Sequence, residues 1–201
     1  MKRNILKITL GVAMIAVLAT ACKKENGTPD SAGVNLSGAK AVIPVNGTQA
    51  GTFTNTSASP TAWTAVGYDL HNNVTATPGV QVQFDSNFNG NITKLSGYYL
   101  GYYDSPSVTD VTGISLSDLS SVSLTTISTL GSNSATVVGW YDYNRTTRAI
   151  TPVAKRYAIV ADASTIADAA RLYVVQLDGV TATGTTGPFT STVNFHTKRL
   201  K

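Results

Sequence analysis

Short apolar runs separated by glycine, asparagine and proline fill the chain beyond residue 38. Val80-Gln-Val-Gln-Phe84 alternates strictly between apolar and polar positions, which is typical of a strand that buries one face. Threonine, valine, tyrosine and serine are abundant in these runs and favour strands. The pattern therefore predicts an all-β domain over residues 39–201. The expected strands are Ala39–Val45, Thr48–Thr54, Trp63–Leu70, Val80–Phe84, Ile92–Leu100, Ala135–Tyr143, Tyr157–Asp162, Arg171–Leu177 and Ser191–Thr197.

Two segments are better suited to helices than to strands. Within Ser115–Ile127 the larger apolar residues recur loosely on one helical face, and Ser115 can form a cap with Asp118. Ala163–Ala170 has the composition for one or two helical turns. We therefore expect one or two short helices beside the strands. The dipeptides Asn46-Gly47 and Asp178-Gly179 are of the kind that close hairpins.

The N-terminus has a basic, then apolar, then small-residue order. The apolar stretch Ile8–Ala21 is too short to cross a bilayer as a stable helix, which takes about 20 residues, and fits a secretory signal instead. It ends directly before Cys22, the only cysteine. This arrangement resembles a bacterial lipoprotein signal, which implies removal of residues 1–21 and acylation of Cys22. The alternatives are a simple signal peptide followed by a chance cysteine, and a buried free thiol.

A polar segment follows the cysteine. Residues 22–38 contain glycine, proline, asparagine and serine without periodicity, as expected of a flexible tether between a lipid and a folded domain. More than one acyl chain on Cys22 would give stable anchoring, so a lipid bilayer is an expected partner.

Most of the net positive charge lies in the predicted signal peptide. The full chain carries 15 Lys and Arg against 11 Asp and Glu, a net charge of +4. Lys2, Arg3 and Lys7 lie in the signal, so the mature chain keeps a net charge of +1. Nucleic-acid binding requires a clustered basic surface and loses its support. The remaining charge is uneven, with a net −5 over residues 41–144 and a net +5 over residues 145–201.

Familiar catalytic motifs are missing from the sequence. It contains no phosphate-binding loop, no dinucleotide-type G-x-G-x-x-G, no H-E-x-x-H and no G-x-S-x-G. A single cysteine excludes an intramolecular disulfide and any cysteine-based zinc site. We therefore expect a binding protein rather than an enzyme, with no resident metal site.

One segment carries a family resemblance. In Val138–Asp162, a Gly-Trp-aromatic strand is followed by a polar turn, an apolar-Thr-Pro step and a Tyr-x-Ile-Val strand. Trp63–Leu70 and Arg171–Leu177 add an early and a late hairpin segment in the same order. Together these segments resemble the HmuY-type haem-binding lipoprotein family over about residues 40–200. The resemblance implies a mostly antiparallel, sandwich-like single domain on the outer membrane or cell surface. It also implies capture of haem, or uptake from a haem protein, beside a TonB-type outer-membrane receptor.

Few side chains remain as iron ligands. Haem iron takes His, Met, Cys or Tyr. Both methionines lie in the signal and Cys22 is assigned to the lipid, which leaves His71 and His196 as the candidate axial ligands beside nine tyrosines. The family places one ligand shortly after the Gly-Trp-aromatic strand, where this chain has Arg145, and a guanidinium cannot coordinate iron. Each histidine is otherwise explained as a solvated residue of a turn or a strand.

Aromatic residues offer a second kind of site. A tyrosine-rich run around residues 98–103 and the aromatic strand near residue 141 could together line a pocket for a flat ring or a sugar. The candidate pocket residues are Tyr102, Tyr103, Trp140, Tyr141, Tyr143 and Arg145. The alternative function is a surface glycan-binding or adhesion module without haem, and a third is an assembly lipoprotein with no small ligand. The simpler interpretation is that these aromatics alternate between core and surface.

Overall fold

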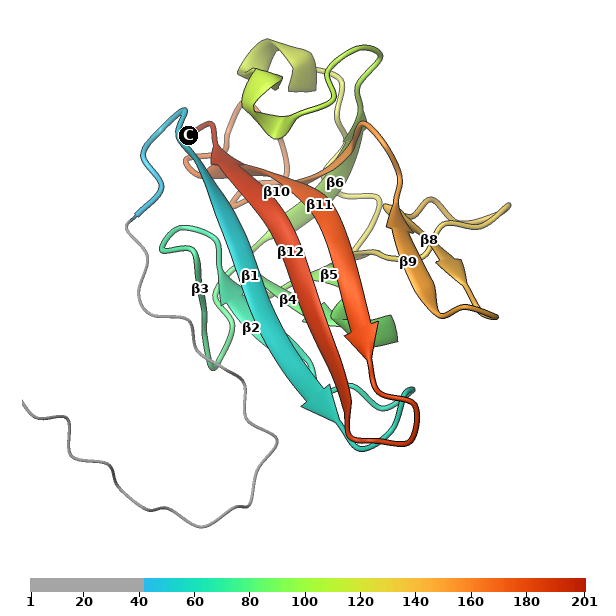
Figure 1. The fold of residues 1–201 in the computed structure, drawn as a ribbon. Helices are drawn as coiled ribbons and strands as arrows, with labels where there is room; N and C mark the ends of the chain where they lie inside the picture. The colour runs from blue at the N-terminus through green and yellow to red at the C-terminus, as the bar shows by residue number, and fades with distance from the viewer. Residues whose placement is uncertain (1–41) are drawn as a thin grey trace, which may run out of the picture. The chain divides into compact units, whose positions relative to one another are not determined.

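Two antiparallel sheets face each other across a shared core in the computed structural model, which describes residues 42–201 (Figure 1). All pairings between the named strands are antiparallel. This architecture confirms the prediction of an all-β, mostly antiparallel, sandwich-like fold. The predicted signal peptide (1–21), the lipidation site Cys22 and the tether (22–38) lie outside the described residues.

The larger sheet has the order β1-β12-β11-β10-β6, with β9 also paired to β11 and β8 paired to β9. Its longest strands, β11 and β12, form a hairpin, and β1 lies along β12 over its whole length. The strands are β1 (Thr48–Ser57), β6 (Tyr99–Asp104), β8 (Tyr141–Asn144), β9 (Ala149–Pro152), β10 (Arg156–Ala161), β11 (Leu172–Thr183) and β12 (Phe189–Arg199).

The smaller sheet has the order β3-β2-β4-β5-β7. Its strands are short because turns interrupt the chain every few residues. They are β2 (Val66–Asp69), β3 (Val74–Thr75), β4 (Val82–Asp85), β5 (Asn91–Lys94) and β7 (Thr129–Leu130).

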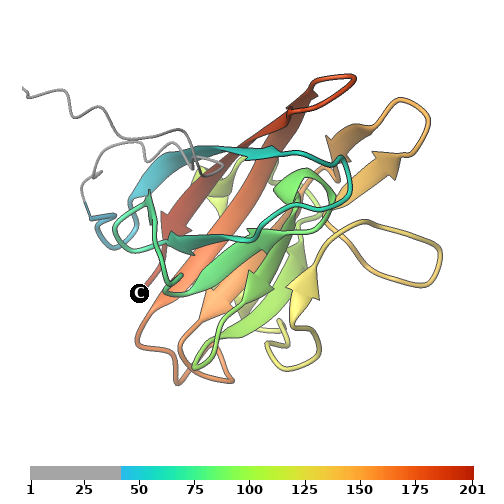
Figure 2. The same cartoon turned by 90° about the horizontal axis from the view of Figure 1, so that it is seen from below.

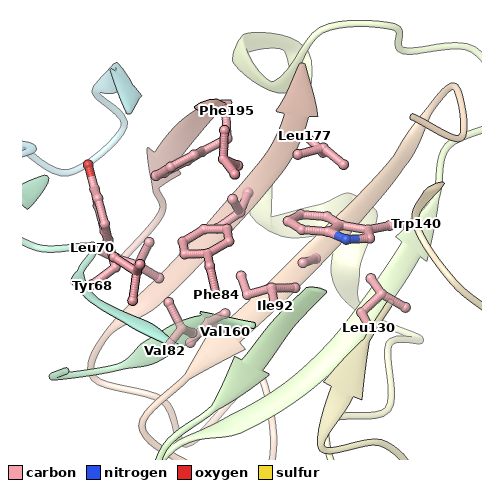
Figure 3. Close-up of a cluster of buried hydrophobic side chains, with 14 of the residues drawn as sticks. Tyr68, Leu70, Val82, Phe84, Ile92, Leu130, Trp140, Val160, Leu177 and Phe195 are labelled. Atoms are coloured by element: carbon pink, nitrogen blue, oxygen red, sulfur yellow. The ribbon is translucent and has the colours of Figure 1, made fainter. Parts of the chain in front are cut away.

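The main core fills the space between the sheets (Figure 3). Alternate residues of β4 and β12 point into it, and the Phe84 and Phe195 rings lie 4.9 Å apart, centre to centre. Trp140 closes one end of this core. The alternation predicted over residues 80–84 holds within β4, where Val82 and Phe84 are buried and Gln83 is half-buried, but before the strand Val80 is exposed and Gln81 is buried.

A second core covers the opposite face of the larger sheet. The 3₁₀ helices η2 (Val111–Gly113) and η3 (Leu116–Leu119) lie over Ile159 and Val174 there. Lys198 on β12 holds the η2–η3 segment against the sheet. Its Nζ donates to the carbonyl oxygens of Thr112 and Ile114 at 2.6 and 2.7 Å. The larger sheet is thus buried on both faces along half of its length.

Of the two predicted helical segments, the first forms a short 3₁₀ helix and the second forms none. Ser115 forms the expected capping box with Asp118, but the helix ends at Leu119 after a single 3₁₀ turn, and Ala163–Ala170 forms bends and turns. Serine and threonine between residues 120 and 128 compete for backbone hydrogen bonds, which explains the short helix.

Several predicted strand limits are also wrong. Ile92–Leu100 is broken by a turn near Gly97, because β5 and β6 belong to different sheets. Residues 135–140 form a loop, and the part of Ala39–Val45 that is described is not a strand. Asp178-Gly179 does not close a hairpin, since β11 continues through it as a β-bulge opposite β12.

Candidate ligand-binding groove

A groove of about 650 Å³ opens where two hairpins separate. The β8–β9 turn, residues 146–149, forms one wall, and the end of β11, residues 180–185, forms the other. β9 and β11 pair only at Ile150 and Val180, so the two backbones diverge beyond that point. Both hairpins project from the same region of the molecule in Figure 2. The volume lies within the usual range of small-ligand sites.

Phe88 forms the floor of the groove, and the backbone around it has unusual dihedral angles. Ser86, Phe88 and Asn89 all have positive φ, between 53° and 60°. Such conformations are uncommon for residues other than glycine and persist where the surroundings hold them in place. The Phe88 carbonyl oxygen accepts a hydrogen bond from the Ser191 hydroxyl of β12, which ties the floor to the larger sheet.

The buried side-chain amides of Asn55 and Asn89 fix the conformation of the turn at residues 86–89. Asn89 is fully buried, and its Nδ2 donates to the carbonyl oxygens of Thr64 and Phe84 at 2.8 and 3.0 Å. Its Oδ1 accepts from Nδ2 of Asn55 on β1 at 2.9 Å. Because every polar atom of the Asn89 side chain is bonded, the turn is fixed without a charged group.

Aromatic rings pack beside the floor. The Trp63 and Phe88 rings lie 5.3 Å apart and the Phe88 and Tyr143 rings 6.3 Å apart, both tilted. Phe88 itself is only 2% exposed, so its ring supports the groove and offers little surface for stacking. The floor is therefore apolar and rigid.

The β8–β9 turn is organised by Asn144. Its Oδ1 accepts from the backbone N–H groups of Thr146 and Thr147 at 2.9 and 3.0 Å. Arg148 closes the turn with φ 58°, and its guanidinium carbon lies 5.9 Å from the centre of the Phe189 ring. This places a cation at the rim of the groove.

Threonine is the most frequent residue in the lining of the groove. Five threonines lie on the two walls, and all of them are exposed. A hydroxyl both donates and accepts hydrogen bonds, so this lining is adapted to a ligand that does the same. The threonines are Thr146, Thr147, Thr181, Thr183 and Thr185.

Two of the aromatic residues proposed for a pocket are core residues. Trp140 and Tyr141 are at most 1% exposed. The Trp140 Nε1–H donates to the Gly90 carbonyl oxygen at 2.8 Å, and the Tyr141 hydroxyl donates to Asn91 Oδ1 at 2.6 Å. Burial raises the pKa of Tyr141 to about 12, so its phenol stays protonated at neutral pH. Their indole and phenol groups hold the fold and face no ligand.

The other candidates are dispersed. Tyr102 packs toward the main core and stacks under the Arg156 guanidinium at 5.4 Å, while the neighbouring Tyr103 packs toward the second core. Tyr143 supports Phe88, as described above, and Arg145 is exposed in the β8–β9 turn without lining the groove. Alternation along the strands explains this separation, because successive residues face opposite sides of a sheet. The six residues do not form one pocket.

The two histidines lie on opposite faces of the larger sheet. His71 Nδ1 is 3.3 Å from the hydroxyl of Tyr173, which belongs to the main core. His196 is paired in register with Gln176, whose side chain contacts the η2 layer on the other face. The His196 Nδ1 instead lies 2.6 Å from Asp178 Oδ2 at the β-bulge. One copy of the domain therefore does not bring both imidazoles to a common iron.

The sequence offers Arg148, with Arg145, Lys155 and Arg156, as a candidate for binding an anion, but it does not bring together the residues that form the groove. Asn87-Phe-Asn-Gly90 has the composition of a turn, which the sequence does signal. The direction of Phe88 depends on its positive φ, and Arg148 stands near Phe189 only because the two hairpins meet in space. Within residues 42–201 no group of three or more His, Cys, Asp or Glu side chains could hold a metal ion.

Comparison with known proteins adds no relative: no protein-family model matches the chain, and no curated protein or solved structure matches it significantly. No helix in the described part of the chain is long and apolar enough to cross a membrane.

Proposed function

We propose that this chain is a lipid-anchored, non-catalytic binding protein of the outer membrane or cell surface, and that its groove takes a carbohydrate. The observation that carries the proposal is the lining of the groove, five exposed threonines over an apolar floor. Sugars present hydroxyls on their rims, which a threonine-rich lining complements. The anchoring rests on the sequence before Cys22.

The lining favours a sugar over haem. Among the described residues that line the groove there is no His, Met, Cys or Tyr, and these are the side chains that bind haem iron. The Phe88 carbonyl and the buried amides beneath it fix the groove before any ligand arrives, which reduces the entropy lost on binding.

The experiment is a glycan array followed by calorimetry on residues 23–201, which contain the whole described fold. A double variant, Thr147→Val with Thr183→Val, removes one hydroxyl from each wall while keeping the side-chain shape. We expect it to weaken binding about tenfold, as for the loss of two hydrogen bonds of about 1 kcal/mol each, partly offset by water. The matched control is Thr56→Val on β1 of the same sheet, outside the groove. Binding that is equal in the double variant and the control would overturn this site.

Haem capture, together with a TonB-type receptor as partner, stays a prediction from the family resemblance. Titration of the same protein with haemin tests it directly. A Soret shift that is lost in His71→Ala or in His196→Ala would favour haem over the sugar. A spectrum equal to that of free haemin leaves the carbohydrate as the proposed ligand.

A further inference from the structure

Arg148 is the one charged residue among the described residues that line the groove. It stands in the β8–β9 turn at the rim, and its guanidinium carbon lies over the Phe189 ring. The ring holds the cation at the groove while the hydrogen-bonding edge of the guanidinium remains available. The groove is therefore neutral along its walls and cationic at one point.

No carboxylate of the described chain neutralises this cation. The two ion pairs within residues 42–201 are Arg156 with Asp104 and His196 with Asp178, and neither includes Arg148. The lining contains no Asp or Glu. An arginine in a ligand groove without an acidic neighbour has its hydrogen-bonding capacity free for an anion.

The backbone conformation of Arg148 also supports a role in binding. Its φ of 58° is a conformation in which glycine and asparagine are the usual residues. An arginine at this position breaks the local rule for hairpin turns, and such exceptions concentrate at functional sites. The guanidinium forms no hydrogen bond to the Asn144 side chain that organises the turn, and its contact is with the Phe189 ring.

We propose that the groove selects acidic glycans, with a carboxylate or sulfate group of the sugar bound by Arg148. The inference rests on the proposed function and narrows its ligand class. The threonine hydroxyls contact the sugar hydroxyls, and the guanidinium fork contacts two oxygens of the anionic group.

The test compares matched oligosaccharides by calorimetry on residues 23–201: a neutral oligogalactose, an oligogalacturonate and a sulfated oligogalactose. Wild type should bind one or both acidic forms about tenfold or more tightly than the neutral form, since a hydrogen bond to a charged group is worth more than a neutral one. Added salt should reduce this preference. The ratio between the two acidic ligands identifies the anionic group.

Three variants separate the role of Arg148 from the fold. Arg148→Gln should remove the preference, and Arg148→Lys should keep part of it because the charge remains without the planar fork. Arg148→Asn should lose the preference while its unfolding temperature does not fall, because asparagine tolerates positive φ. Arg171→Gln changes an exposed arginine before the other end of β11 and should retain wild-type selectivity.

Two kinds of result would overturn the proposal, and they have different consequences for the carbohydrate function. Neutral and acidic oligosaccharides bound equally, or full selectivity in Arg148→Gln, would remove the acidic specificity and leave a sugar-binding groove. Binding of none of the three ligands would count against the carbohydrate function itself and against this inference with it.

Discussion

The side-chain amides of Asn55 and Asn89 join the two sheets through a hydrogen bond of 2.9 Å, at a point where each residue is at most 1% exposed. Asn55 belongs to β1 of the larger sheet, and Asn89 follows β4 of the smaller one. A buried amide without partners would be costly, but here the surrounding carbonyls satisfy both groups. The contact therefore fixes the relative position of the sheets as well as the floor of the groove.

Replacing Asn89 should be strongly destabilising. Asn89→Ala removes three buried hydrogen bonds, of which the one at Thr64 has a second donor in Asn55 Nδ2, and it places alanine at φ 57°. We expect a loss of about 3 kcal/mol in the free energy of unfolding, measured by urea denaturation. Asn194→Ala, at an exposed position of β12, is the control and should change the free energy of unfolding by less than about 0.5 kcal/mol. Equal effects of the two variants would contradict the structural role of Asn89.

The two tryptophans should differ in their fluorescence and in their effect on stability. Trp140 is 1% exposed and donates to the Gly90 carbonyl oxygen, whereas Trp63 is half-buried. Trp140→Phe should cost about 2 kcal/mol through the lost bond and the cavity, and it should leave a protein that emits at longer wavelength. Trp63→Phe should cost less and retain blue-shifted emission. The opposite order of emission maxima would place Trp140 at the surface.

Acid should destabilise the fold partly through Asp69. Burial acts to raise the pKa of this carboxyl, but hydrogen bonds from Asn72, Gln81 and His71 outweigh it, and the pKa lies below the ordinary value of 3.8. Since the folded state binds its proton at lower pH, the contribution to stability is complete above pH 3.8 and is lost as the pH falls through the folded-state pKa.

The measurement is the free energy of unfolding as a function of pH. In Asp69→Asn the slope at acidic pH should be smaller than in wild type. Asn72→Ala keeps the carboxyl and removes a donor, so its slope should be intermediate. An unchanged slope in Asp69→Asn would show that other groups control acid unfolding.

Lys198 should matter for the second core and not for the groove. Its Nζ donates to two carbonyl oxygens of the η2–η3 segment, and the residue is 9% exposed. Lys198→Met keeps the apolar stem and leaves both carbonyls without this donor, which should cost about 2 kcal/mol. Hydrogen exchange should speed up around residues 111–119. Faster exchange in the β8–β9 turn instead would show that the effect is not local.

The strands could be predicted because their pattern depends on burial of one face. Val82–Phe84 alternate between buried and half-buried in β4 as expected, whereas Val80 and Gln81 before it do not follow the predicted pattern. The break at Gly97 has a turn signal in Ser96-Gly97, but the residues on either side have the same strand character and only the tertiary fold assigns them to different sheets. Asp178-Gly179 has the composition of a hairpin turn, yet pairing with β12 on one side and β9 nearby keeps β11 extended through it.

The candidate site was harder to predict, because its residues come together only in the tertiary fold. His71 and His196 are the available iron ligands by elimination, but elimination contains no information on which face of a sheet each side chain occupies. Trp140 and Tyr141 are as well suited to a core as to a pocket, and burial decides between these roles. Arg148 and Phe88 lie 60 positions apart in sequence and come together only through the meeting of two turns.

The direction of β1 has a mechanical consequence. The strand is paired with β12 from Thr48 opposite Lys198 to Ser57 opposite Phe189, and the second of these pairs lies at the end where Arg148 covers the Phe189 ring. Tension between the N-terminal side of the fold and a ligand in the groove would run parallel to these strands. The hydrogen bonds between β1 and β12 would then be loaded in shear, so they would have to break together and not one after another. A protein held at one end and bound at the other would resist flow with the whole length of this strand pair.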